Sequence, residues 1–225
     1  MLDPDHLHER FTVDGYVNFD LLSFVPGIAE LAERVACIEE SRWSFIIKNG
    51  HGEHDIAPAE RDEAERQHLI ANEERERGDF SFSFRWIPDT RENCDLEPLQ
   101  QVKQILGSEV VMELLRAVTG RSASGVSQCY LSWFERGHFL GTHCDPGQSF
   151  GVALSLTQDW DPNFGGLTLL VPECEGAVSS CLVPTPYRLL VFDTSARHIP
   201  HLVSMVSAPA GRRRLAAIAR YLATP

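Results

Sequence analysis

Two histidines and an aspartate in the second half of the chain have the types and spacing of a metal site. His143 and Asp145 are separated by one residue, and Pro200-His201-Leu202-Val203 follows much later. Residues i and i+2 of an extended segment project to the same side, so His143 and Asp145 can reach one ion. Two imidazoles and one carboxylate form the facial triad that holds non-haem Fe(II) and leaves coordination positions open. The pattern predicts chemistry at a metal held by His143, Asp145 and His201.

Further motifs accompany these residues and carry a resemblance to a known family. Together with Phe134-Glu-Arg-Gly137-His-Phe-Leu140, Gly165-Gly166 and Arg214-Leu-Ala216, they resemble the Fe(II)/2-oxoglutarate-dependent oxygenases. The likeness is to the branch of prolyl 4-hydroxylase-like domains and small amino-acid hydroxylases, and it runs from about Gly125 to Leu222. It implies an α+β protein with a double-stranded β-helix (jelly-roll, cupin-like) core and N-terminal helices packed on it.

The resemblance also implies an activity, a dioxygenase reaction with Fe(II), 2-oxoglutarate as cosubstrate and O2. The expected reaction hydroxylates an unactivated C–H bond of an amino acid or aminoacyl substrate, prolyl residues included, and releases succinate and CO2. Asp145 favours hydroxylation, because related halogenases carry Gly or Ala at that position. His143, Asp145 and His201 are thus expected as both metal ligands and catalytic residues.

The third ligand and the cosubstrate anchor each have a rival nearby. His198 lies three residues before His201, but only Pro200-His201-Leu202-Val203 fits the motif of the family. For the basic residue that binds the distal carboxylate of 2-oxoglutarate, Arg212-Arg213-Arg214 offers three candidates. Strand alternation places Arg213 on the face opposite Arg214, and the family places its basic residue before a hydrophobic and then a small residue. We expect Arg214 as the anchor and keep Arg213 as the alternative.

Further residues are candidates for contacts with the cosubstrate or the substrate. The family's tyrosine in the Tyr-x-x-Gly-His motif is Phe134 here, so Tyr130 or Ser132, which share the strand parity of Phe134, could supply a hydroxyl instead. Phe80-Ser-Phe82-Ser-Phe84-Arg-Trp86 has a period of two and predicts a strand whose aromatic face is buried. If its other face looks into the barrel, Arg85 could bind a substrate carboxylate.

Length and charge agree with one enzyme domain. The 225 residues are 43% hydrophobic and carry a net charge of -12, with only two lysines. This charge argues against a nucleic-acid surface, because such affinity depends on cations that neutralise phosphates. The chain has no run of 18 apolar residues and no basic-then-apolar leader, so we expect a cytoplasmic protein with no membrane contact. The sequence does not indicate an oligomeric state.

The order of elements indicates a single oxygenase domain over residues 1–225. A helix- and strand-containing elaboration is expected over 1–120, with helices over 4–12, 26–37, 58–78, 98–106 and 108–119. From 121 to 225, short strands separated by Gly and Pro turns predict the jelly-roll core. The charged 58–78 helix is either a solvated surface element or a lid over the iron site. As a lid it would attract a small cationic amino acid to the cleft.

Three rival interpretations remain open on sequence. Gly147-Gln-Ser149-Phe-Gly151 matches a nucleophile elbow, and Asp193 and His201 follow in hydrolase order, yet a strand rather than a helix is expected after Ser149. A jelly roll with two histidines and an aspartate could also hold Zn(II) without redox chemistry. The segment from His51 to Asp55 could form a second metal site. The oxygenase interpretation is preferred because it alone explains a carboxylate anchor at Arg214.

Overall fold

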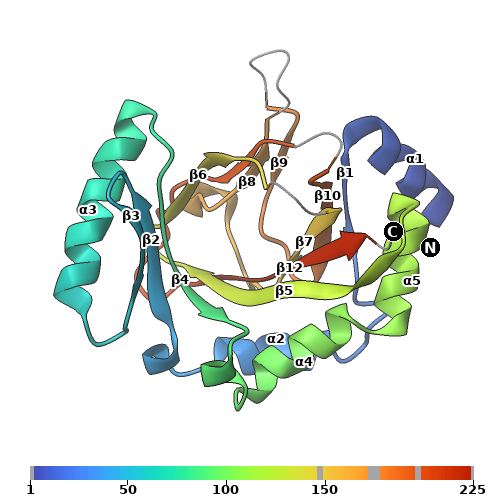
Figure 1. The fold of residues 1–225 in the computed structure, drawn as a ribbon, viewed down its shortest axis with the longest axis horizontal. Helices are drawn as coiled ribbons and strands as arrows, with labels where there is room; N and C mark the ends of the chain where they lie inside the picture. The colour runs from blue at the N-terminus through green and yellow to red at the C-terminus, as the bar shows by residue number, and fades with distance from the viewer. Residues whose placement is uncertain (1–2, 146–148, 172–177, 196–198, 224–225) are drawn as a thin grey trace.

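A computed structural model describes residues 3–145, 149–171, 178–195 and 199–223. Within these residues the strands form one antiparallel sheet that curls over itself into two layers (Figure 1). The larger layer runs in the order β1 (Tyr16–Asp20), β10 (Arg188–Asp193), β7 (Phe150–Ser155), β12 (Arg214–Ala223), β5 (Ala123–Phe134) and β4 (Phe82–Pro88). The smaller layer runs in the order β6 (Phe139–His143), β11 (His201–Val203), β8 (Thr168–Leu170) and β9 (Ser180–Leu182). The hairpin of β2 (Ser44–Asn49) and β3 (Gly52–Ile56) joins β4.

Five α-helices in the described chain cover the outside of the larger layer. They are α1 (Pro4–Asp14), α2 (Ile28–Ala36), α3 (Arg61–Arg77), α4 (Glu97–Leu106) and α5 (Glu109–Thr119). Three short 3₁₀ turns occupy Glu40–Arg42, Arg91–Asn93 and Pro162–Phe164. Figure 1 shows α2 and α4 beneath β5 and β12, and α1 beside α5. A strand-rich double-stranded β-helix with helices on its outer face confirms the fold class expected from the sequence.

Strand alternation divides the side chains of the larger layer between two environments. On β12, Leu215, Ala217, Ala219 and Tyr221 point toward the helices and belong to the main hydrophobic core. On the opposite face of the strand, Arg214, Ile218 and Arg220 line a cavity between the two layers. The neighbouring strand β5 behaves in the same way, with Leu131 and Trp133 in the core and Tyr130, Ser132 and Phe134 on the cavity. One face of each strand therefore holds the fold together while the other forms the site.

The helix α3 lies on the outside of the sheet and not over the cavity. Its Ala64 and Ala71 pack with Phe45 and Ile47 of β2. Cross-strand pairing puts Phe45 opposite Arg85 of β4, and both lie on the face away from the cavity that Phe84 lines. The hypothesis that 58–78 forms a lid is therefore wrong. Ala64 and Ala71 lie on one side of a helix whose other side carries the charges, and they pack it flat on the sheet.

Three strands were not expected from the sequence as separate elements. These are β1, β3 and β6, of which β3 contains most of the segment that was considered as a second metal site. Its Glu53, His54 and Asp55 alternate in exposure, as in an edge strand with one solvated face. None of the helices in the described part of the chain is long and apolar enough to cross a bilayer.

Candidate metal centre

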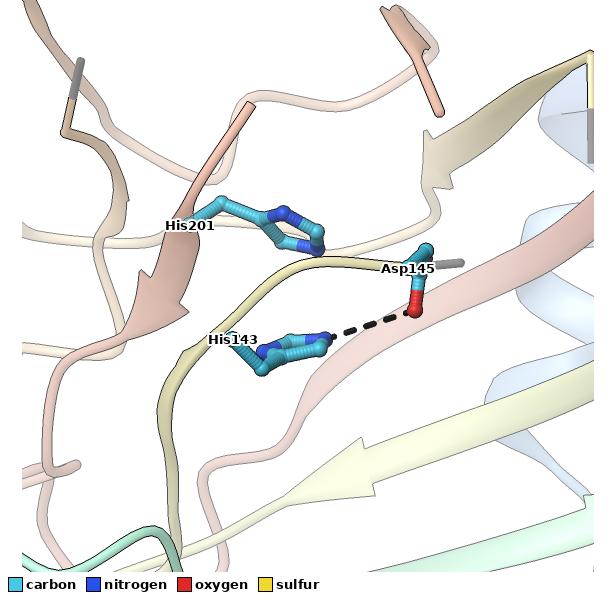
Figure 2. A group of neighbouring side chains, drawn as sticks. All are labelled: His143, Asp145 and His201. Atoms are coloured by element: carbon cyan, nitrogen blue, oxygen red, sulfur yellow. Dashed lines mark ion pairs between the residues drawn. The ribbon is translucent and has the colours of Figure 1, made fainter. Parts of the chain in front are cut away.

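Cross-strand pairing brings the two histidines together. His143 ends β6 and His201 begins β11, and the two residues are direct partners in the antiparallel register. Asp145 lies two residues beyond His143, and its carboxylate points back toward both imidazoles (Figure 2). His143 Nε2 is 3.6 Å from Asp145 Oδ1, and the two imidazole centroids are 4.3 Å apart. One donor atom from each of the three side chains lies within 4.8 Å of the others.

The backbone fixes which nitrogen each imidazole presents. Nδ1 of His143 is 3.0 Å from the carbonyl oxygen of Gly141, and Nδ1 of His201 is 3.0 Å from that of Ile199. Each Nδ1–H donates to the carbonyl two residues earlier, so Nε2 keeps the lone pair that a metal requires. Burial, followed by the nearness of His143, lowers the pKa of His201 to about 4. His201 is therefore neutral at pH 7, as a ligand must be.

The donor set fits a divalent transition metal. Two neutral imidazoles and one carboxylate match the set that holds non-haem Fe(II), and both histidines have the backbone partner that orients such ligands. Among the described residues, no other group of three His, Cys, Asp or Glu side chains comes together in this way. The segment from His51 to Asp55 does not, because His54 faces Asn49 and Asp55 accepts a hydrogen bond from Trp86.

The three side chains open into a cavity between the two layers of the sheet. Its wall is mainly apolar and includes Phe84, Phe134 and Phe192. Among the described residues, its charged groups are Asp145, Arg214 and Arg220. An apolar pocket with a few convergent polar groups is typical of a small-molecule site.

Arg214 is a buried cation at the inner end of the cavity. It is 9% exposed, and its NH2 donates to Thr168 Oγ1 over 2.9 Å. Its Nε is buried without an acceptor, and among the described residues no carboxylate lies within ion-pair distance of it. Burial lowers the pKa of Arg214 to about 10. The hydroxyl of Ser155, on the neighbouring strand β7, is also buried and unpaired. A desolvated cation with donors left over is suited to an anionic ligand.

Arg213 lies on the other side of β12, as alternation predicted. Its guanidinium carbon is 4.1 Å from the ring centroid of Trp133, and its NH1 is 3.4 Å from the carbonyl of Ala36. Of the two candidates for the anchor, only Arg214 lines the cavity.

Arg85 does not reach the cavity, so the hypothesis that it binds substrate is wrong. Its guanidinium stacks between the rings of Phe45 and Trp133, at 4.3 and 4.5 Å. It pairs with Glu40 at 2.9 Å and with Glu135 at 3.2 Å. The reason is the orientation of β4: Phe84 faces the cavity, while Ser81, Ser83 and Arg85 face the outer helix and hairpin and are almost fully buried there. On β4 the side that looks polar in the sequence is therefore an interior side as well.

Tyr130 and Phe134 both line the cavity, as their shared parity on β5 predicted. Burial raises the pKa of Tyr130 to about 12, so its hydroxyl is a neutral donor or acceptor at pH 7. Phe134 stacks on Phe84 at 4.7 Å and lies 5.0 Å from the guanidinium carbon of Arg214. The departure from tyrosine at 134 thus gives an apolar surface beside the buried arginine.

Sequence reasoning missed three polar residues of the cavity region: Ser155, Thr168 and Arg220. Arg220 had a signal, since it lies six residues after Arg214 on the same strand and therefore on the same face. Thr168 and Ser155 had none, because a single hydroxyl in an apolar strand is common and only the pairing of strands brings it to the arginine.

The arrangement needed for a serine hydrolase is not formed. The strand β7, not a helix, follows Ser149, and the Nδ1–H of His201 donates to Ile199 rather than to a carboxylate. Asp193 is held by a bidentate pair with Arg121, with oxygen–nitrogen distances of 2.9 and 2.8 Å. His198, the alternative third ligand, lies outside the described residues.

Comparison with known proteins supports the fold. No protein-family model matches the sequence, and no curated protein matches it. Solved structures match along nearly the whole chain. A prolyl-4-hydroxylase of Pseudomonas putida has a TM-score of 0.58 and 16% identity, over 97% of this chain and 98% of that one. An oxidoreductase of the 2OG-Fe(II) oxygenase family from Burkholderia pseudomallei has a TM-score of 0.66 and 14% identity, over 98% and 91%.

A third similar structure is a Trichoplax adhaerens prolyl hydroxylase in complex with a peptide fragment of the hypoxia inducible factor oxygen degradation domain. Its TM-score is 0.63 at 17% identity, over 97% of this chain and 88% of that one. At such low identities the likeness concerns the fold. The class that the fold defines is the double-stranded β-helix that these oxygenases share.

Proposed function

We propose that this protein is an Fe(II)- and 2-oxoglutarate-dependent dioxygenase that hydroxylates an amino acid or aminoacyl substrate. The observation that carries the proposal is Arg214, a buried arginine without a carboxylate partner among the described residues, in the same cavity as His143, Asp145 and His201. A metal-binding protein without redox chemistry has no use for such an anion site. The shared fold with 2OG-Fe(II) oxygenases supports the same conclusion.

The residues divide the work as follows. His143, Asp145 and His201 would hold Fe(II), and Arg214 with Thr168 would hold the distal carboxylate of 2-oxoglutarate. When bound, iron would activate O2, the oxidant, with two electrons drawn from 2-oxoglutarate and two from the substrate C–H bond, so that one oxygen atom enters succinate, with release of CO2, and the other the hydroxylated substrate carbon. The guanidinium of Arg214 suits its task because its fork can donate two parallel charge-assisted hydrogen bonds to one carboxylate.

The apolar wall contributes by excluding water. Phe84, Phe134 and Phe192 line the space between the metal ligands and Arg214. A dry site strengthens the pairing of Arg214 with a carboxylate and protects reactive species from side reactions. The neutral hydroxyl of Tyr130 is available there to orient a bound ligand.

The decisive experiment is an anaerobic titration. Adding 2-oxoglutarate to the Fe(II)-loaded protein should produce the metal-to-ligand charge-transfer absorption band of a chelated 2-oxo acid. Exposure to O2 with a suitable amino acid or peptide should then release succinate. Tight metal binding without that band would reject the oxygenase and leave a non-redox metal protein.

A further inference from the structure

We propose that Arg220 is the substrate-binding cation of this site and that the substrate carries a free carboxylate close to the carbon that is oxidised. This inference rests on the proposed function. It separates free amino acids, peptide C-termini and acidic side chains from the other residues inside a polypeptide, because those offer no carboxylate.

Arg220 lies in the outer part of the cavity. Arg214 and Arg220 lie on the same face of β12, six residues apart, which separates their Cα atoms by roughly 20 Å along the strand. If Arg214 binds the single molecule of 2-oxoglutarate, Arg220 remains available to bind the substrate. The side chain of Arg220 is 21% exposed, whereas Arg214 is buried. Arg220 thus lies toward the solvent side, where a substrate would enter.

Arg220 is aimed at the metal ligands. Its NH2 donates to Asp145 Oδ1 over 2.6 Å, and its NH1 donates to Gln128 Oε1 over 2.9 Å. Nε is buried and has no acceptor among the described residues. A guanidinium has five N–H donors, so these contacts leave donors free for a ligand beside the reacting centre.

The charges of the cavity lead to the same requirement. Among the described residues, its charged side chains are Arg214, Arg220 and Asp145, with the histidines neutral as metal ligands. Binding of a metal dication and the 2-oxoglutarate dianion leaves one positive charge in a largely apolar cavity. A substrate carboxylate beside Arg220 would pair with that charge locally, and a buried charge without a partner is costly.

A purely structural role for Arg220 makes a different prediction. If the residue only orients Asp145, its loss should weaken the metal. If it serves the substrate, its loss removes a cation beside a dication, so that metal affinity stays the same or rises. We would measure Zn(II) binding to metal-free wild type, Arg220→Gln and Arg116→Gln by calorimetry. Arg116 is exposed on α5 and provides the same change of charge away from the cavity. A tenfold or greater weakening confined to Arg220→Gln would overturn the proposal.

The second arm tests the ligand. The twenty free L-amino acids, their amides and acetylated tripeptides with free or amidated C-termini would be screened for succinate release by wild type. Only members with a free carboxylate should respond, and the free amino acids and tripeptide acids distinguish the two sources. For the best acid, Arg220→Gln should raise KM on the order of a hundredfold with kcat within a few-fold, because a charge-assisted pair is lost. With the matching amide as substrate, wild type and Arg220→Gln should have equally low kcat/KM.

These outcomes separate the inference from the proposed function. If wild type shows no charge-transfer band with 2-oxoglutarate, the proposed function fails and this inference with it. If the band forms but amides support succinate release as well as acids do, or no free acid does, the function stands and the role of Arg220 is wrong. Calorimetric binding of the best acid to the Zn(II) and 2-oxoglutarate complex, weakened about a hundredfold in Arg220→Gln, checks the result without turnover.

Discussion

At the scale of single residues, we expect Arg214 to have opposite effects on the stability of the protein and on the binding of 2-oxoglutarate. Its guanidinium is removed from water, and among the described residues only a hydroxyl accepts from it. Taking an ion out of water costs several kcal/mol unless a partner compensates, and replacing such a charge by an apolar side chain is often stabilising. We therefore expect Arg214 to destabilise the ligand-free fold and to strengthen the binding of 2-oxoglutarate.

We expect Arg214→Met to stabilise the ligand-free protein by about 1–3 kcal/mol, because the buried charge is gone. The same change should weaken the binding of 2-oxoglutarate about a hundredfold, which corresponds to about 3 kcal/mol. Urea unfolding and the anaerobic band titration measure the two effects. Arg213→Ala, on the other face of β12, is the control and should bind 2-oxoglutarate almost normally. A strong effect of Arg213→Ala with none from Arg214→Met would contradict the assignment.

The ligand set gives a second prediction at this scale. His143→Ala, Asp145→Ala and His201→Ala should each abolish tight Fe(II) binding and succinate release, since each removes one of only three protein donors. His198→Ala should keep metal affinity and activity within a few-fold. If His198→Ala is the inactive variant, the third ligand has been assigned to the wrong histidine. Calorimetry with Mn(II) or Zn(II) gives the affinities without turnover.

At the scale of elements, the Gly165-Gly166 turn lies very close to the backbone of Met205, just after the end of β11. Gly165 has φ of 66°, and a Cβ there would lie 2.1 Å from the backbone oxygen of Met205. Gly165→Ala should lower the free energy of unfolding by about 3 kcal/mol, from the left-handed conformation and the clash together. Gly27→Ala meets nothing within 4 Å and should change stability by less than about 0.5 kcal/mol. Equal stability of the two variants in urea unfolding would refute this account of the turn.

The elements also show what sequence patterns can and cannot predict. Residue parity predicted that Arg213 and Arg214 face opposite sides of β12, because a strand repeats every two residues wherever it lies. Parity could not predict which side of β4 faces the cavity, since Ser81 and Ser83 look solvent-facing until α3 covers them. The motif residues were found because chemistry restricts their types. The polar β3 was missed because an edge strand with a solvated face resembles a loop.

At the scale of the whole molecule, burial of a histidine makes the fold sensitive to acid. His138 is 7% exposed, and burial, followed by the nearness of His68, lowers its pKa to about 3. The unfolded chain binds this proton below pH 6.5 and the folded protein does not, so stability falls as pH falls from 6.5 toward 3. At about 1.36 kcal/mol per pH unit, the loss between pH 6.5 and 5 is about 2 kcal/mol.

His138→Gln should remove that contribution, because glutamine stays neutral and its side-chain oxygen can still accept from the backbone N–H of Glu135, as Nδ1 of His138 does. Urea unfolding of wild type and His138→Gln at pH 7 and pH 5 gives the comparison. The variant should lose less stability on acidification by about 2 kcal/mol. Parallel losses in the two proteins would mean that His138 is protonated in the folded state as readily as in the unfolded one.

The alternation along β12 makes this strand a natural target for engineering. One face of β12 packs against the helices through Leu215, Ala217, Ala219 and Tyr221. The opposite face carries Arg214, Ala216, Ile218 and Arg220. A mutant library restricted to positions 218 and 220 would alter side chains that line the cavity and leave the core residues and Arg214 unchanged. We therefore expect new substrate preferences to be accessible through two codons.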